Sequence, residues 1–324
     1  MKPLVFLEHD GAELESGAVG VLGKAATFTD GDVAAVLAGR GPLDGLAARA
    51  AAHGAARMFV AEDDALDPPV AQPRIDLIER VMADGGYDTV LFSTSVLAAD
   101  VAAGLAGRLG AGLNWDLVDL ELRDGEPVGR RLALQDSVMV DVGWRSTPRL
   151  ALFRRGVFDA ATPVAREPVT EAVTVPATEP SRRVTVVEHT PSAADGPSIG
   201  DAEVIVAGGI GLGGAEHFAL AEELAAVLGG AVGATRAAVY KGWYPAAAQI
   251  GQTGRTVSPR LYVALGISGA VQHKVGMQNS KVIVAINTDA HAPIFGFSDL
   301  GVVGDVHTIV PKLVDLLQER KGRD

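Results

Sequence analysis

Three glycines between a predicted strand and a predicted helix form the first group of residues that could bind a ligand. Gly209, Gly211 and Gly214 match the pattern G-x-G-x-x-G. In that pattern the missing side chains let a phosphate approach the backbone, and the following helix attracts its negative charge. A nicotinamide dinucleotide site usually adds an acidic residue about 20 residues on, but this position carries Thr235 and Arg236 instead. Two interpretations stay open, a nucleotide-binding turn or a tight turn without a ligand.

A second group of polar residues follows in the same half of the sequence. Residues 249–259 form a loop with amide and hydroxyl side chains, interrupted by glycines. A strand then runs into Gly266 and Ser268, where Ser268 is predicted to cap a helix whose N–H groups could hold a phosphate. His273 lies one turn into that helix. A histidine at this place either faces a ligand or is a structural group with satisfied hydrogen bonds.

Two further polar residues follow strand-like runs. Asn287 ends the run Val284-Ala-Ile-Asn, and Asp305 ends Gly301-Val-Val-Gly-Asp. In doubly wound folds, ligands bind at the carboxyl ends of the strands, so both side chains could reach the same ligand. Alternatively, each residue only caps a helix or forms a turn.

Composition restricts the classes of protein to which the chain could belong. It has 324 residues, 48% of them hydrophobic, a net charge of -12 and no cysteine. The acidic balance and the absence of Lys and Arg clusters exclude a broad nucleic-acid surface. The lack of cysteine excludes disulfides, thiolate catalysis and iron–sulfur clusters. No apolar run is long enough to span a bilayer and the start lacks a signal-peptide pattern, so we expect a soluble, cytoplasmic protein without membrane insertion.

Two α/β domains are expected to position these groups. Strands and Ala-rich helices alternate up to residue 110, which indicates a parallel sheet. After it, runs at 117–122, 128–134, 137–142 and 149–153 predict an antiparallel extension. Valine-rich runs at 173–175 and 184–187 could add edge strands, and a turn-rich stretch at 191–197 follows. A second doubly wound unit begins at residue 203, so we predict domains at 1–199 and 200–324. The first helix is expected to be weak, because Gly17, Gly20 and Gly23 interrupt it.

Several long motifs resemble the C-terminal domain of electron transfer flavoprotein alpha subunits. They are Val-Gly-Ala-Thr-Arg-Ala-Ala-Val (232–239), Ile-Gly-Gln-Thr-Gly (250–254), Leu-Tyr-Val-Ala-Leu-Gly-Ile-Ser-Gly-Ala-Val-Gln-His (261–273), Met-Gln-Asn-Ser-Lys-Val-Ile-Val-Ala-Ile-Asn (277–287), Ala-Pro-Ile-Phe (292–295) and Gly-Val-Val-Gly-Asp (301–305). The resemblance covers residues 203–317, and the first half matches only loosely, through its opening strand, His9 and its α/β order. It implies a Rossmann-like domain that binds FAD.

The resemblance also implies which residues bind the cofactor. By position they are Ile210, Thr235, Arg236, Ile250, Gly251, Gln252, Thr253, Ser268, Gly269, Ala270, Val271, Gln272, His273, Asn287, Asp305 and Val306.

Their implied roles divide along the cofactor. Arg236 approaches the isoalloxazine, the Thr253 hydroxyl reaches flavin N5 and His273 faces the C2 carbonyl. Thr235 and residues 268–272 serve the ribityl and phosphate groups, while Asn287 and Asp305 hold the adenosine end. One position departs from the family, which usually has Gly-Gly-Arg-Gly where this chain has Ile210. We expect this change to affect the flavin potential and the choice of partner.

The implied function is electron transfer without conversion of a substrate. The chain would pair with an electron transfer flavoprotein beta subunit and accept electrons from a flavin-dependent dehydrogenase, such as an acyl-CoA dehydrogenase. It would pass them to a quinone oxidoreductase or another acceptor. Two alternatives stay open. One is a nicotinamide-dependent oxidoreductase that uses the glycine turn, and the other is a nucleotide-binding module without redox chemistry.

Overall fold

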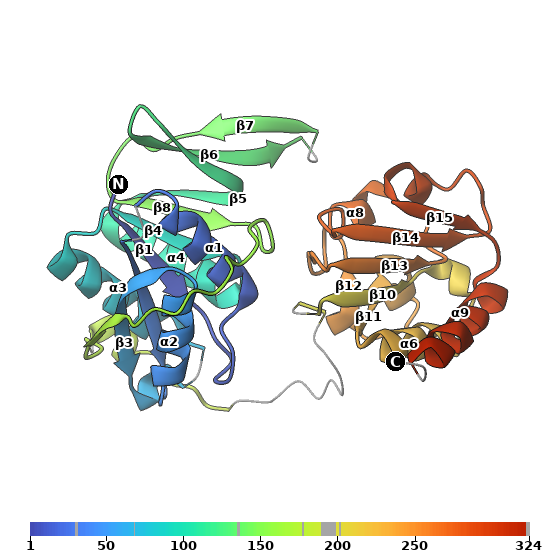
Figure 1. Ribbon diagram of the computed structural model, residues 1–324, viewed down its shortest axis with the longest axis horizontal. Coiled ribbons are helices and arrows are strands. Elements are labelled where there is room, and N and C mark those ends of the chain that lie inside the picture. Colours follow the sequence, from blue (N-terminus) through green and yellow to red (C-terminus); the bar gives the residue numbers. More distant parts are fainter. Residues whose placement is uncertain are drawn as a thin grey trace. The chain divides into compact units, whose positions relative to one another are not determined.

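The computed structural model describes residues 1–29, 32–67, 69–134, 137–176, 178–188, 199–200 and 202–321. The chain divides into two compact units, Met1–Pro191 and Ser192–Asp324, each with its own sheet (Figure 1). Ile199 is buried in the core of the second unit, although the predicted boundary places this residue at the end of the first domain. The functional division at 199/200 stays a prediction, and the turn predicted at 191–197 lies outside the described residues.

The first unit contains nine strands in the order β7-β6-β5-β8-β4-β1-β2-β3-β9 among the described residues. The strands are β1 (Pro3–Leu7), β2 (Val33–Gly39), β3 (Ala55–Glu62), β4 (Thr89–Ser93), β5 (Gly112–Arg123), β6 (Glu126–Ala133), β7 (Val138–Val142), β8 (Arg149–Phe153) and β9 (Val169–Ala172). The helices are α1 (Ser16–Ala26), α2 (Asp44–Ala52), the 3-10 turn η1 (Asp64–Leu66), α3 (Ala71–Gly85), α4 (Val96–Leu109) and the short α5 (Glu179–Arg182).

Helices cover both faces of the central part of this sheet. Alternate residues of β1 show the arrangement: Leu4 and Phe6 pack in one cluster with α3 and α4, while Val5 and Leu7 pack in another with α1 and α2. Successive side chains of a strand point to opposite faces, and a parallel sheet is usually covered on both. Every residue of β1, β2 and β4 is therefore buried. The predicted α/β class is confirmed.

Two details of the first sheet differ from the sequence-based expectation. β6 pairs antiparallel with both β5 and β7, as expected for the extension. β8, however, lies between β4 and β5 and is parallel to both. After β7, the chain enters the sheet between these two strands and does not extend its edge. The edge beyond β3 is formed by β9, at residues 169–172, and no strand is assigned to residues 184–187.

The first helix forms in spite of its glycines, so the expectation of a weak helix was wrong. Its glycines let the neighbouring chain approach closely: a Cβ on Gly20 would collide with the carbonyl of Phe158, and one on Gly23 would lie 3.3 Å from the Cβ of Ala161. The glycines therefore permit packing that compensates for their low helix propensity. Glu15 adds a strong N-cap, because its carboxylate accepts hydrogen bonds from the N–H groups of Gly17 (3.0 Å) and Ala18 (2.6 Å).

This packing makes a testable distinction between two helical glycines. We expect Gly20→Ala to destabilise the first unit by about 1–3 kcal/mol, since the carbonyl of Phe158 is backbone and cannot rotate away. Gly107 in α4 is exposed, and a Cβ added there would meet no heavy atom within 4 Å, so Gly107→Ala is expected to stabilise by about 0.5–1 kcal/mol. Urea unfolding of both variants measures the difference. Equal effects of the two substitutions would contradict the packing argument.

The second unit has a six-stranded sheet, β12-β11-β10-β13-β14-β15, in which all pairings are parallel. Its elements are β10 (Val204–Gly208), η2 (Ile210–Leu212), α6 (Phe218–Leu228), β11 (Ala231–Thr235), α7 (Arg236–Tyr240), η3 (Ala246–Ala248), β12 (Gln249–Ile250), β13 (Leu261–Leu265), α8 (Val271–Lys274), β14 (Val282–Asn287), η4 (Pro293–Phe297), β15 (Leu300–Val303) and α9 (Val306–Lys321).

Its two faces are covered differently. α6 and α9 pack side by side on one face, through Phe218, Leu224 and Val310 (Figure 1). The other face is covered by Ile250, Met277 and Ile294, which come from short elements and loops rather than from long helices. The predicted doubly wound arrangement is confirmed. The layer on the face opposite α6 and α9 is irregular. None of the helices among the described residues is long and apolar enough to cross a membrane.

Candidate functional site

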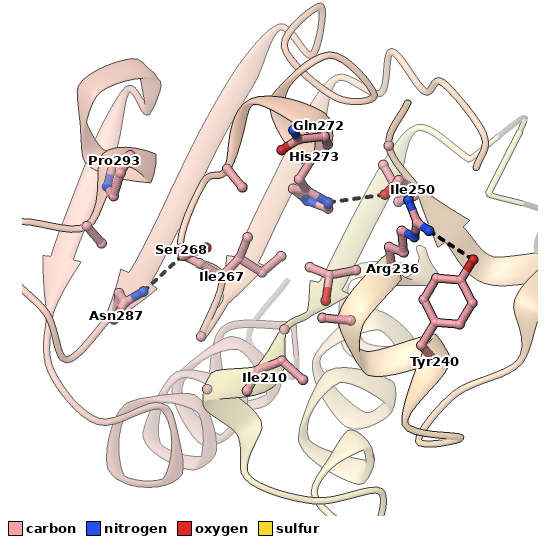
Figure 2. A pocket seen from close by; sticks show the side chains of 18 of the residues that line it. Ile210, Arg236, Tyr240, Ile250, Ile267, Ser268, Gln272, His273, Asn287 and Pro293 are labelled. Atoms are coloured by element: carbon pink, nitrogen blue, oxygen red, sulfur yellow. Dashed lines mark hydrogen bonds between the residues drawn. The ribbon is translucent and has the colours of Figure 1, made fainter. Parts of the chain in front are cut away.

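A cavity of about 700 Å³ opens at the carboxyl ends of the strands of the second unit. It is lined by the segments that follow β10, β11, β12, β13 and β14, as parallel strands dictate. In Figure 2, Arg236 and Tyr240 lie at one end of the cavity and Asn287 and Pro293 at the other, with Ile210 opposite His273. The predicted site residues in its wall are Ile210, Thr235, Arg236, Ile250, Gly251, Gln252, Thr253, Ser268, Ala270, Gln272, His273 and Asn287.

The glycine turn after β10 is used mainly by the protein itself. The N–H of Gly209 donates to the carbonyl of Leu265 and the N–H of Gly211 donates to that of Gly266, both at 2.9 Å. A Cβ on Gly211 would lie 2.7 Å from the Cα of Gly266, so the two turns touch through their backbones. These N–H groups cannot also bind a phosphate. α6 begins only at Phe218, several residues after the turn, which further weakens the match to a dinucleotide-binding turn.

The turn after β13 instead offers free donors. Within the described part of the chain, no acceptor is found for the backbone N–H groups of residues 267–272. Gly266 and Gly269 have φ values of +60° and +85°, which bend this segment around the end of the cavity. Successive N–H groups in such a turn attract an anion. Ser268 is not the helix cap that the sequence predicts, because Ala270 holds that position and no side chain bonds to it.

His273 is held by two hydrogen bonds inside the protein and is only 6% exposed. Its Nδ1 lies 3.2 Å from the carbonyl oxygen of Ile250, which can only accept, so Nδ1 carries the proton. Nε2 then accepts from the hydroxyl of Tyr262, at 2.9 Å. Burial lowers the pKa of His273 to about 4, and the ring is neutral. His273 thus reaches the cavity wall but both of its nitrogens are already used.

The loop after β12 presents Thr253 to the cavity. The side-chain amide of Gln249 donates to the Thr253 hydroxyl at 3.1 Å, which leaves the hydroxyl proton available for a ligand. The loop is fixed by a bond of 2.7 Å from the N–H of Gln252 to the carbonyl of Gln272. Gly251 has a φ of +138°, and a Cβ there would lie 2.8 Å from that same carbonyl. Only glycine fits between the loop and α8.

Arg236 begins α7 at the open end of the cavity. Its guanidinium lies over the ring of Tyr240, 4.7 Å from the centroid, and Nη2 donates to the Tyr240 hydroxyl at 3.2 Å. Thr235 caps the same helix, since its hydroxyl accepts from the N–H of Ala238 at 3.4 Å. The first turn of α7 therefore places the guanidinium of Arg236 along the wall of the cavity.

Asn287 joins the far ends of two strands. Its side-chain amide donates to the carbonyl of Ile267 at 2.9 Å, and its oxygen accepts from the N–H of Asp289, also at 2.9 Å. The two hydrogen bonds of this side chain thus link the segments that follow β13 and β14 at the cavity wall.

Four predicted residues do not line the cavity: Gly269, Val271, Asp305 and Val306. Gly269 serves the turn, since a Cβ there would collide with the backbone of Ile294. Asp305 accepts from the N–H of His307 at the start of α9, and the side chain of Val306 is 3% exposed in the core. A direct contact of these residues with a ligand stays a prediction.

The sequence missed several residues of the wall, namely Ala237, Tyr240, Ile267, Asp289, Ala292 and Pro293. Tyr240 could have been found, because it lies four residues after Arg236 and such pairs share a face of a helix. Asp289 lies two residues after Asn287, which ends a strand-like run in the sequence. The others are small or apolar, and no chemical pattern distinguishes them.

The lining is suited to an elongated, anionic ligand with a polar ring system. Free N–H groups at 267–272 can bind phosphate oxygens, and Arg236 can stabilise negative charge at the other end. Between them, the partly exposed side chain of Ile210 offers apolar surface for a flat ring. These features fit a flavin dinucleotide better than a ligand bound at the glycine turn after β10.

Comparison with known proteins gives a consistent result. Residues 3–194 match the family model described as the electron transfer flavoprotein domain, and residues 198–278 match the electron transfer flavoprotein FAD-binding domain. The chain is 39% identical over 326 residues to the electron transfer flavoprotein subunit alpha of Mycobacterium leprae, covering 98% of this chain and 99% of that protein.

Two further proteins show the same relation over nearly the full length. The electron transfer flavoprotein subunit alpha of Mycobacterium tuberculosis is 40% identical, with 98% of this chain and 99% of the relative covered. Protein FixB of Clostridium saccharobutylicum is 36% identical, with 97% and 96% covered. A solved thiamin diphosphate-dependent enzyme from Mycobacterium smegmatis aligns with a TM-score of only 0.23, at 11% identity and with 98% of this chain and 60% of that one covered, which is too low to inform on the fold.

The buried histidine predicts a pH dependence of stability. An unfolded histidine has a pKa of about 6.5, and burial lowers that of His273 to about 4. Between these values the unfolded chain binds a proton that the folded chain does not, so stability is full above pH 6.5 and falls as the pH drops. We expect this group to cost about 2 kcal/mol between pH 7 and pH 5.

The variant His273→Gln should lose this part of the pH dependence. His291→Gln, at an exposed position, is the matched control and should keep it. Urea unfolding of the complete chain at pH 7, 6 and 5 measures both. If His273→Gln retained the wild-type dependence on pH, His273 would not be the buried neutral group described above.

Proposed function

This chain belongs to the electron transfer flavoprotein alpha-subunit family, and from that premise we propose that it carries electrons on FAD bound in the cavity of the second unit. The observation that carries the location is the turn at 267–272, for whose N–H groups no acceptor is found in the described part of the chain. Four of its residues, Ile267, Ser268, Ala270 and Gln272, line the same cavity as Arg236. The family-model match over residues 198–278 includes both.

The residues of the chain would divide the work as follows. FAD supplies a ring system that takes up and releases electrons and becomes more negative as it is reduced. The N–H groups of residues 267–272 would bind its phosphates, and Arg236 would stabilise the added negative charge. The hydroxyl of Thr253 can donate a hydrogen bond, since it accepts from Gln249. His273 would act by holding the loop of Ile250 in place, because its nitrogens are engaged.

A beta subunit is proposed to complete the site. Tyr240 is 71% exposed and Ile210 is 40% exposed, although both line the cavity. A cofactor held between these side chains would be open to water on one side unless a partner covered it. We further propose that the complex accepts electrons from a flavin-dependent dehydrogenase, such as an acyl-CoA dehydrogenase, and donates them to a quinone oxidoreductase or another acceptor. The chain itself would convert no substrate.

The nicotinamide alternative is less well supported. It would place a pyrophosphate at Gly209 and Gly211, whose N–H groups are already bonded to Leu265 and Gly266. It would also need an acidic side chain at the end of β11, where Thr235 and Arg236 stand.

Purification of the chain together with its beta subunit tests the proposal. We expect a yellow heterodimer with the absorption spectrum of a flavin, one FAD released on denaturation, and bleaching when a reduced flavin-dependent dehydrogenase is added. The chain alone is expected to retain FAD poorly. A colourless complex would favour a nucleotide-binding module without redox chemistry, and bleaching by NADH alone would favour the nicotinamide-dependent enzyme.

Ile210 provides a second test within the same complex. The resemblance to the family implies arginine at this position, whereas Ile210 offers no charge. We expect Ile210→Arg to raise the first reduction potential of the bound FAD by several tens of millivolts, as a partly screened charge worth about 1–2 kcal/mol would do. Ile210→Met is the neutral control and should leave the potential near that of the wild type. Equal potentials for the two variants would show that position 210 acts through packing alone.

A further inference from the structure

Arg236 is the principal source of positive charge in the cavity. The titratable side chains that line it in the described part of the chain are Arg236, Tyr240, His273 and Asp289. His273 is neutral, and Asp289 belongs to the segment after Asn287, at the end remote from α7 (Figure 2). Ile210 adds no charge to the opposite wall. Among the described residues, any stabilisation of negative charge by a cationic side chain of the cavity wall therefore depends on where this one guanidinium group lies.

No carboxylate within 4 Å fixes that guanidinium among the described residues. Its contacts are to Tyr240, through the ring at 4.7 Å and through the hydroxyl at 3.2 Å. An arginine side chain at a surface has several accessible rotamers, and holding one of them costs conformational entropy. A partner that fixes the cation without neutralising it must be polarisable and uncharged. Tyrosine meets both requirements, whereas an aspartate or glutamate would cancel the charge.

Tyr240 has little other role in the fold. It ends α7, its side chain is 71% exposed, and it belongs to neither core cluster of the second unit. Its spacing of four residues from Arg236 places both side chains on one face of α7, along the wall of the cavity. Figure 2 shows the hydroxyl pointing to the guanidinium.

We propose that Tyr240 is a positioning residue, which holds the guanidinium of Arg236 at the mouth of the cavity where it acts on the bound cofactor. The ring stabilises the cation from one side by a cation–π contact, and the hydroxyl accepts one of its N–H groups. This inference rests on the proposed function, since it assigns a role toward FAD. The effect of the Arg236 charge on the cofactor would then depend on Tyr240, a neutral residue that takes no part in electron transfer itself.

The test uses the heterodimer with FAD and two measurements, the dissociation constant for FAD and the first reduction potential. Tyr240→Leu removes the ring and the hydroxyl, and is expected to weaken FAD binding about 3- to 10-fold and to lower the potential. Tyr240→Phe keeps the ring and should give a smaller change, about 2- to 3-fold in binding. Tyr244→Phe is the control: Tyr244 stacks on Phe218 and bonds to Glu222 outside the cavity, so neither value should change.

A double-mutant cycle separates positioning from direct contact with the cofactor. In an Arg236→Leu background, Tyr240→Leu should have no further effect on either value, because no cation is left to hold. An equal effect of Tyr240→Leu with and without Arg236 would overturn the proposal and assign Tyr240 a contact of its own. Wild-type values in Tyr240→Leu would also overturn it. Absence of FAD from the wild-type complex would instead refute the proposed function.

Discussion

The second unit depends on the direct contact between two backbone turns, those after β10 and β13. Gly211 approaches Gly266 so closely that neither position has room for a side chain, and the N–H groups of Gly209 and Gly211 are engaged in bonds across this contact. The contact forms the floor of the cavity. It also bears on anion binding: the N–H groups of Gly209 and Gly211 are already engaged, whereas no acceptor is found for those of residues 267–272 in the described part of the chain. A glycine-rich pattern that is typical of nucleotide binding thus serves the packing of the protein, and we propose that the neighbouring turn binds the cofactor instead.

In the first unit, a carboxylate of the chain itself occupies the N-terminus of the first helix. At the start of α1, where a phosphate could bind in such folds, the carboxylate of Glu15 accepts from Gly17 and Ala18 and also pairs with the Nε of Arg155 at 2.7 Å. The chain therefore supplies its own anion. A ligand phosphate would have to displace a carboxylate with three hydrogen bonds.

Local sequence patterns predicted the helices and strands well where periodicity and burial agree. They predicted poorly those features that depend on contacts between residues far apart in the sequence. The strand at 149–153, for example, was predicted with its observed bounds. The position of β8 between β4 and β5 could not be read from its own residues, since strand order depends on the whole sheet. The glycines of α1 led to a wrong expectation, because helix propensity does not take into account the packing of residues 158–161 against this helix. In the site, most of the predicted residues line one cavity, but the state of His273 depends on Tyr262 and Ile250, which lie on other elements.

The cavity wall has a consequence for the biosynthesis of the protein. Its residues run from Gly209 to Pro293, and the last of them come from the segment after β14. A nascent chain that has not yet emerged from the ribosome beyond residue 293 lacks one wall of the cavity, whereas the nine-stranded sheet of the first unit can already be complete. A cofactor bound in this cavity could therefore be captured only after residue 293 has emerged. Since a ligand stabilises only the state that binds it, cofactor supply would protect finished chains and give no protection to truncated ones.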